Sequence, residues 1–241
     1  MTKLYEAHKS NYRSVAAALK HVERSVNSAL RIGDGPATKA LTTTQMLLVA
    51  VKAEARLQKL LHTPGWLNDS QRAYILSAAT RLAMWERLIE VGFRQRYRKA
   101  KRNVPLLDQL DHDAAARYKT LLEILEIDLR EIIEIRNKLA HGQWSYGLTA
   151  EGAISTEITK RLRIANTLEL RFQDSIAEDL ANAVGDLLQP GRKFEDSFNG
   201  HFRKIKSSHE HLGNLDFPAH VARLKATKQN IRVTYTIAKG L

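Results

Sequence analysis

Residues 113–141 read DAAARYKTLLEILEIDLREIIEIRNKLAH and carry the strongest fold signal in the chain. Apolar side chains recur along this stretch at three- and four-residue steps, the period of one face of an α-helix. The side chains on this face are Tyr118, Leu122, Leu125, Leu129 and Ile132. The next position on the face is Arg136, and a buried guanidinium needs a partner because an unpaired buried charge is costly. The stretch therefore predicts a long helix that ends in a paired cation.

The preceding sequence has the same helical period over residues 3–30, 43–62 and 69–93, with Asn68 or Asp69 as the cap of the third helix. Gly33–Pro36 and Thr63–Gly65 interrupt the pattern. Long helices joined by short breaks predict a mainly α fold, an up-and-down helical bundle over residues 1–143.

After residue 143 the composition changes, and we expect residues 144–241 to form a small mixed α/β appendage packed on the bundle. A hairpin is expected around residues 150–152, where Glu151 and Gly152 occur. Helices are expected over residues 174–188, 194–211 and 218–228, and the alternating pattern of residues 231–238 predicts a strand.

Composition limits the function classes. The chain has 241 residues, of which 44% are hydrophobic, enough for a sizeable core. It has no cysteine, which excludes disulfides, thiolate metal sites and cysteine nucleophiles. No signal peptide and no membrane-spanning run of roughly 20 apolar residues is recognisable, so we expect a cytoplasmic protein with no membrane association. His209 and His211 diverge on a helix, and we expect neither a metal site nor a cofactor.

The formal net charge of +12 indicates a polyanionic partner, since Lys and Arg bind nucleic acid by neutralising its phosphates. The densest basic run lies at residues 94–102 and includes one aromatic ring on which a base could stack. We expect RNA binding by Arg94, Arg96, Tyr97, Arg98, Lys99, Lys101 and Arg102. The alternative is a solvated helix end whose cations oppose the negative end of the helix dipole.

Residues 136–141, Arg-Asn-Lys-Leu-Ala-His, stand at the end of the last long helix and are followed by Gly142. This arrangement resembles the HEPN superfamily, whose motif is an arginine followed after four to six residues by a histidine, often with a polar residue directly after the arginine. The resemblance covers roughly residues 43–144. Residues 53–62 are also similar to the early helix of one HEPN group, in which an acidic residue faces the motif. The resemblance implies a helical bundle that dimerises through its motif helices and cleaves RNA without metal, often in toxin or antiviral systems.

Each residue of the motif suits a step of RNA cleavage. The imidazole of His141 can exchange protons near neutral pH, and the guanidinium of Arg136 matches two phosphate oxygens. Asn137 lies four residues before His141 and could orient its ring or bind phosphate. Lys138 adds charge, and Glu54 is a possible partner of Arg136 or of the histidine, with a solvent-facing glutamate as the alternative.

Spacing predicts that one chain alone makes a poor active site. Positions five apart on a helix diverge by about 140°, so Arg136 and His141 cannot both face one phosphate from one ideal helix. Two motif helices that meet across a two-fold axis can line one cleft, which predicts a homodimer with a composite site. An antitoxin or another regulatory protein is a possible further partner. HEPN toxins paired with a nucleotidyltransferase antitoxin often carry a tyrosine two residues after the histidine, but this chain has Gln143 there, so we do not expect that form of regulation.

The expected function is a metal-independent endoribonuclease of the HEPN class that acts as a toxin or antiviral defence effector, with Arg136, His141 and Asn137 as its catalytic residues. The alternative is a non-catalytic HEPN-type protein that binds RNA or a nucleotide or serves as a scaffold. A DNA-binding regulator is disfavoured because the sequence has no helix-turn-helix signature.

Overall fold

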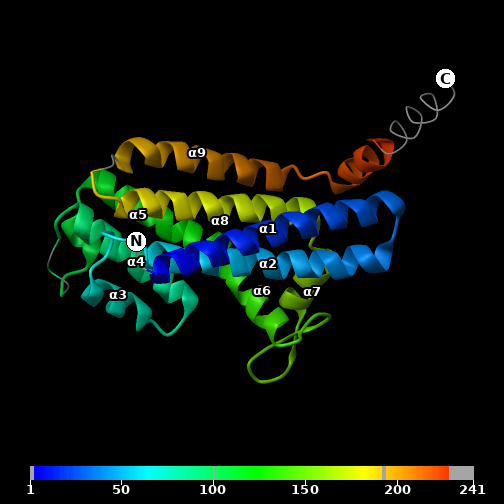
Figure 1. Cartoon of the computed structure of the whole chain (residues 1–241), viewed down its shortest axis with the longest axis horizontal. Coiled ribbons are helices and arrows are strands. Elements are labelled where there is room, and N and C mark those ends of the chain that lie inside the picture. Colours follow the sequence, from blue (N-terminus) through cyan, green and yellow to red (C-terminus); the bar gives the residue numbers. More distant parts are fainter. Residues whose placement is uncertain (1–2, 100, 102, 192–193, 228–241) are drawn as a thin grey trace.

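The computed structural model describes residues 3–99, 101, 103–191 and 194–227. Long helices lie side by side, and a small lobe projects from one flank of the stack (Figure 1). The predicted mainly α bundle is confirmed, since strands occur in the described residues only as a short antiparallel pair, β1 (Gly147–Leu148) and β2 (Ile154–Ser155). This pair confirms the expected hairpin. None of the described helices contains a stretch long and apolar enough to cross a membrane.

The first two helices, α1 (Lys3–Ile32) and α2 (Gly35–Leu61), form an antiparallel hairpin. The chain reverses at Gly33, whose φ of 75° lies in the left-handed region that glycine adopts without strain. Asp34 then caps α2, because its side-chain oxygen accepts a hydrogen bond of 3.0 Å from the Ala37 amide. With Pro36 in the first turn as well, α2 begins eight residues earlier than the pattern of apolar residues alone predicts.

The single helix predicted over residues 69–93 is wrong at one place, because the chain breaks between α3 (Asp69–Leu76) and α4 (Arg81–Arg96). Thr80 starts the second helix by accepting a hydrogen bond of 3.1 Å from the Ala83 amide. Arg87 donates to the Tyr74 carbonyl at 2.7 Å, which satisfies an acceptor at the end of α3. Asn68 caps α3, as expected, in a reciprocal capping box with Gln71.

The stretch that decides the fold is helical throughout, with one irregularity. A 3-10 turn (Leu106–Gln109) leads to α5 (His112–Ile124), a π-helical turn (Leu125–Leu129) follows without a break, and α6 (Arg130–Ala140) completes the run. Of the predicted apolar face, Leu125, Leu129 and Ile132 are buried in the core. The π turn therefore keeps these side chains inside while it shifts the helical register before the motif.

The helical core continues past residue 143, where the sequence placed the end of the bundle. The short α7 (Thr156–Ile164) belongs to the projecting lobe, whereas α8 (Thr167–Leu188) packs against α2, α4 and α9 (Phe194–Gly213). Residues 217–227 are also helical. Asn166 caps α8 through hydrogen bonds from the amides of Leu168 (3.1 Å) and Glu169 (3.0 Å), which starts this helix before the predicted position 174.

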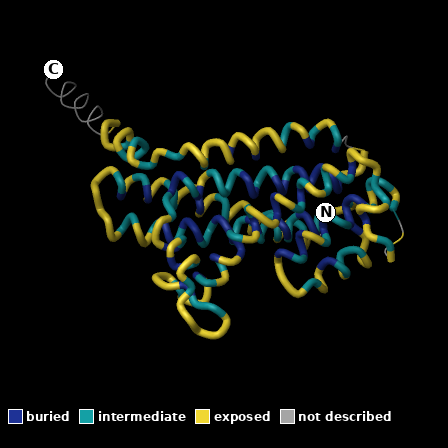
Figure 2. Tube along the Cα trace, turned by 180° about the vertical axis from the view of Figure 1, so that it is seen from behind, coloured by how far each residue is buried: buried dark blue, intermediate teal, exposed yellow. Residues whose placement is uncertain are grey.

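Buried residues gather where these helices meet, and exposed residues follow the projecting lobe (Figure 2). One buried apolar cluster contains residues from most of the long helices, including Leu57 of α2, Phe93 of α4, Leu180 of α8 and Phe194 of α9. Residues on both sides of position 143 thus share one core. The strand expected at residues 231–238 lies outside the described residues.

The contact between α4 and α8 provides a stability test. A Cβ atom at Gly92 would lie 2.7 Å from Cδ2 and 2.9 Å from Cγ of the buried Leu187. Overpacking costs about 1–3 kcal/mol and outweighs a gain of up to about 1 kcal/mol in helix propensity. We therefore expect Gly92→Ala to unfold at a lower urea concentration than the wild type.

The matched control is Gly200→Ala in α9, where a Cβ atom would lie more than 4 Å from every described neighbour that it could contact. Only the helix-propensity gain of about 0.5–1 kcal/mol then applies, so this variant should unfold at a higher urea concentration. Equal shifts for the two variants would contradict the close approach of α4 to α8.

Candidate active site

The motif predicted from the sequence lies at the free end of α6, next to the projecting lobe. Arg136 and Asn137 are in the last turns of the helix, and His141 is its C-terminal cap residue. Gly142 follows with a φ of 78°, the left-handed conformation that ends many helices. Trp144 folds back, and its indole nitrogen donates a hydrogen bond of 3.0 Å to the Leu139 carbonyl, which satisfies one of the last acceptors of the helix.

Glu54 of α2 and Arg136 of α6 form an ion pair. Nη2 of the arginine lies 3.2 Å from Oε2 of the glutamate, and the two side chains are 32% and 16% exposed, respectively. Nη1 donates a second hydrogen bond, of 3.1 Å, to Oδ1 of Asn137. The structure therefore confirms the expected contact between Glu54 and Arg136, so this glutamate does not face solvent freely.

This ion pair leaves hydrogen-bonding capacity unused. Among the described residues, buried Nε of Arg136 and buried Oε1 of Glu54 have no hydrogen-bond partner. A guanidinium has five N–H groups, and the two hydrogen bonds above occupy two of them. Arg136 is therefore held in position while it keeps donors for an anion.

Arg136 and Asn137 form one wall of a pocket of about 590 Å³. The opposite wall is the turn between α3 and α4, and two further arginines, Arg81 and Arg130, also line the pocket. Its volume lies in the range that is usual for small-molecule and substrate sites. The lining contains three arginines and one acidic residue, Glu134, so it is net cationic. It suits a phosphate-bearing ligand, since arginine binds phosphate oxygens through paired N–H groups.

The sequence analysis missed Arg81 and Arg130. Arg81 lines the pocket because the turn between α3 and α4 packs beside α6. The spacing of residues within one helix does not predict such a contact. Arg130 precedes Arg136 by six residues, about 1.7 turns of the same helix, so helical spacing alone did not place the two side chains together. Arg130 pairs with Glu126 at 2.6 Å on the exposed surface, so it shares its charge with that carboxylate.

His141 does not line this pocket, and the residue is exposed. The described chain thus brings Arg136, Asn137 and Glu54 together but leaves the histidine on another side of the helix end. This separation agrees with the divergence of about 140° expected for positions five apart. In the part of the chain that the structure describes, no group of three His, Asp or Glu side chains is placed to hold a metal ion.

Lys138 supports the neighbouring lobe. Its ammonium group donates to the Leu148 carbonyl, and the Leu148 amide donates a hydrogen bond of 2.7 Å to Oε1 of Gln143. Both contacts fasten the hairpin to the end of α6. Near them, the exposed ring of Tyr146 lies under the guanidinium of Arg163, 4.7 Å from it.

The basic run at residues 94–102 is largely engaged in packing. Arg94 pairs with Glu90 at 2.7 Å and donates to the Lys101 carbonyl, while Arg96 lies over the Phe194 ring. Tyr97 stacks on Phe93, and its hydroxyl donates a hydrogen bond of 2.8 Å to Glu195.

Arg98 and Lys101 of the same run are exposed, Lys99 is half-buried, and Arg102 lies outside the described residues. The run begins at Arg94, near the far end of α4 from Arg81 and about 20 Å from it at 1.5 Å per residue. Only a few cations of the basic run are therefore exposed and able to bind RNA, and they are distant from the Arg136 pocket.

Comparison of the chain with protein-family models, curated proteins and solved structures finds no match.

The ion pair between Glu54 and Arg136 can be tested by a double-mutant cycle of Glu54→Gln and Arg136→Met. The pair is only partly screened by solvent, so we expect a coupling free energy of about 1 kcal/mol from urea unfolding. The control cycle is Glu126→Gln with Arg130→Met, an exposed pair on one helix for which we expect a smaller coupling. A coupling no larger than that of the control would contradict the anchoring of Arg136.

The packing of Tyr97 can be tested by titration. Burial, together with the hydrogen bond to Glu195, raises the pKa of Tyr97 to about 12. Because the fold favours the neutral phenol, its contribution to stability is complete below pH about 10 and is lost as the pH rises towards 12. The absorbance difference between the wild type and Tyr97→Phe should show ionisation near pH 12; ionisation near pH 10 would mean that the ring is open to solvent.

Proposed function

We propose that this protein is a metal-independent endoribonuclease that cleaves single-stranded RNA, acting as a toxin or antiviral defence effector of the HEPN type. The observation that carries the proposal is the arrangement around Arg136. Its guanidinium is anchored by Glu54 at 3.2 Å and lies beside Asn137 on the wall of an open pocket. Arg81 and Arg130 on the same pocket offer further phosphate contacts.

RNA carries the nucleophile for its own cleavage. A base removes the proton of the 2′-hydroxyl, O2′ bonds to phosphorus, the bond between phosphorus and O5′ breaks, and an acid gives O5′ a proton. Arg136 would stabilise the extra negative charge on the phosphoryl oxygens, with Asn137 as a neutral donor beside it. The products are a 2′,3′-cyclic phosphate and a 5′-hydroxyl end, and the step needs no further reactant.

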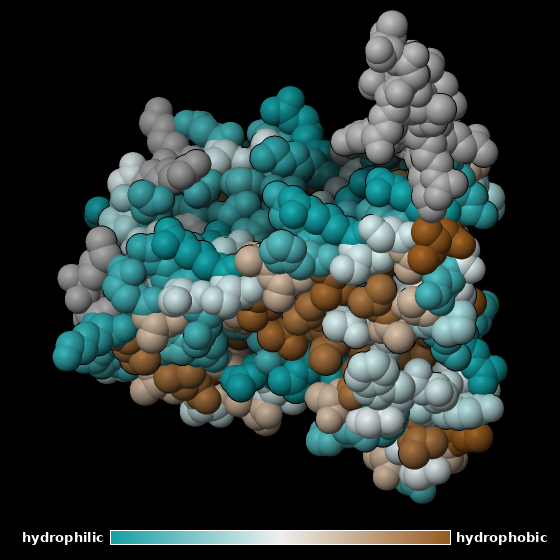
Figure 3. Space-filling model, turned by 45° about the vertical axis from the view of Figure 1, so that its right-hand side comes forward, coloured by the Kyte–Doolittle hydropathy of each residue, from teal (hydrophilic) through white to brown (hydrophobic). Residues whose placement is uncertain are grey.

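His141 supplies the proton transfers in this proposal, and a homodimer brings it to the pocket. Since His141 diverges from Arg136 on its own helix, a second copy related by a two-fold axis supplies the missing imidazole. The exposed apolar side chains of the lobe support such pairing, with Trp144 43%, Tyr146 52% and Ile154 62% exposed. Apolar surface is also visible on this lobe in Figure 3.

The test is cleavage of an end-labelled single-stranded RNA by the purified protein in EDTA. General acid–base catalysis contributes typically about 10²–10⁴-fold, so His141→Ala should lower the cleavage rate by at least about 100-fold. Arg136→Lys should also lower the rate, because an ammonium lacks the paired donors of the guanidinium. The control His21→Ala, at an exposed position of α1, should cut at the wild-type rate.

Two outcomes would overturn the proposal: an RNA that stays intact with the wild-type protein, or cleavage by His141→Ala at the wild-type rate. An RNA with a 2′-deoxy residue at the cut position should resist cleavage there, because it lacks the nucleophile. Sedimentation of the wild type and of His141→Ala should show the same dimer, which separates a chemical defect from a loss of assembly.

The second candidate function is RNA binding without cleavage, with the protein acting as a scaffold. It is favoured by one observation, that His141 does not line the Arg136 pocket of its own chain. Intact RNA together with salt-dependent binding that Arg81→Ala weakens would support this function. In either case, we place the protein in the cytoplasm, with an antitoxin or another regulatory protein as a possible partner.

A further inference from the structure

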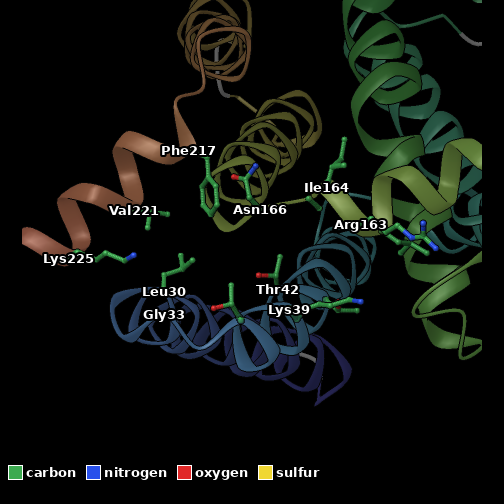
Figure 4. Close-up of a pocket in the computed structure, with 15 residues that line it drawn as sticks. Leu30, Gly33, Lys39, Thr42, Arg163, Ile164, Asn166, Phe217, Val221 and Lys225 are labelled. Atoms are coloured by element: carbon green, nitrogen blue, oxygen red, sulfur yellow. The ribbon is translucent and has the colours of Figure 1, made fainter.

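A second pocket, of about 470 Å³, lies at the other end of α2 and shares no lining residue with the Arg136 pocket. Three segments that are distant in sequence enclose it. They are the turn between α1 and α2, the turn between α7 and α8, and the helical residues 217–227 (Figure 4). The pocket therefore depends on the tertiary fold, and no sequence pattern indicated it.

One side of this pocket is apolar. Phe217 and Val221 project from the last helical segment towards Leu30 of α1, as Figure 4 shows. Leu162 and Ile164 complete the apolar lining. Apolar area removed from water contributes roughly 25 cal/mol per Å², so a ligand with an apolar body gains affinity here.

The charged groups on the lining are all cationic. Among the residues that the structure describes, Lys39, Arg163 and Lys225 line the pocket, and no aspartate or glutamate does. Among the described residues, Lys39 and Lys225 have no acidic partner within 4.0 Å. In Figure 4 the ammonium group of Lys225 extends towards the opening. Lys225 thus places a positive charge at the opening, while the guanidinium of Arg163 lies over the Tyr146 ring of the lobe.

Carboxylates near the pocket are used as helix caps. Asp34 accepts a hydrogen bond of 3.0 Å from the Ala37 amide, at the start of α2. Asp216 accepts one of 2.9 Å from the Ala219 amide, at the start of the last helical segment. Neither aspartate lines the pocket.

Thr42 adds a polar group to the wall of the pocket. The residue is only 8% exposed and lines the pocket, and Figure 4 shows its hydroxyl directed into it. The hydroxyls of Thr38, Thr43 and Thr44 each donate to the carbonyl four residues earlier, whereas that of Thr42 has no hydrogen-bond partner among the described residues. This hydroxyl is therefore free to donate a hydrogen bond to an oxygen of a ligand in the pocket.

We propose that this pocket binds a small organic anion with an apolar body, such as an aliphatic carboxylate. Lys225 attracts the anionic group, the Thr42 hydroxyl donates a hydrogen bond to it, and Phe217, Val221 and Leu30 enclose the apolar part. This site is separate from the RNA site and does not depend on the proposed ribonuclease activity.

Calorimetric titration of the full chain with octanoate, octan-1-ol and inorganic phosphate tests the proposal. Octanoate has both parts of the ligand, so it should bind at least ten times more tightly than either the neutral alcohol or phosphate alone. Vesicles of phosphatidylglycerol separate a free anion from a membrane lipid as the source, and we expect them not to capture the protein. Octanol binding as tightly as octanoate, or capture by vesicles without octanoate binding, would overturn the proposal.

Substitutions of pocket residues test whether octanoate binds in this pocket. Lys225→Glu should weaken octanoate binding at least tenfold, and Thr42→Val, which keeps the shape and removes the hydroxyl, should weaken it several-fold. The control Lys206→Glu makes the same charge change at an exposed position of α9 and should bind as the wild type does. Wild-type affinity in both pocket variants, with unchanged thermal unfolding, would disprove the assignment.

Discussion

The central position of α2 is the constraint on which the rest of the structure depends. It packs against α1, α6 and α8, and two charged side chains fix two of these contacts. Lys52 pairs with Asp174 of α8 at 2.8 Å, and Glu54 pairs with Arg136 of α6 at 3.2 Å. Residues two apart on a helix point about 200° apart, so α2 holds one helix on each side. Burial would lower the pKa of Lys52, but the carboxylates of Asp174 and Glu178 outweigh it and raise the pKa.

The same constraint explains why Arg136 can serve a chemical role without disturbing the fold. A functional cation must be held within a fraction of an ångström by groups that are themselves fixed. Glu54 meets this requirement because α2 is buried along much of its length. The end of α6 is fixed separately, by the hydrogen bonds of Trp144 to Leu139 and of Lys138 to Leu148. These contacts therefore hold the motif in place, although it lies at a helix end beside a small lobe.

The helices and the Glu54–Arg136 contact could be predicted from patterns within single segments of the sequence. The helix break, the packing of α8 and the two pockets depend on contacts between distant segments and could not. The helical period of residues 113–141 indicated a buried face that ends at Arg136, and a buried cation requires an acidic partner. The break before Arg81 was missed because the apolar pattern continues across it, and the role of Thr80 as a cap is seen only in the structure. The packing of α8 in the core was not predicted, because the pattern of residues 167–188 does not indicate which other helices they contact. Neither pocket was predictable, since each joins segments separated by at least forty residues of sequence.

The net charge of +12 overstates the free cationic surface, because several arginines act inside the fold. Arg72, Arg87 and Arg94 donate to the carbonyls of Leu61, Tyr74 and Lys101 at 2.9, 2.7 and 2.7 Å. Cations that line pockets are therefore more informative than the total. One pocket carries three arginines, whose planar forks match phosphate oxygens. The other combines two lysines and one arginine with an apolar wall, which suits a smaller anion that also buries a hydrocarbon part. The two pockets therefore suit ligands of different chemistry.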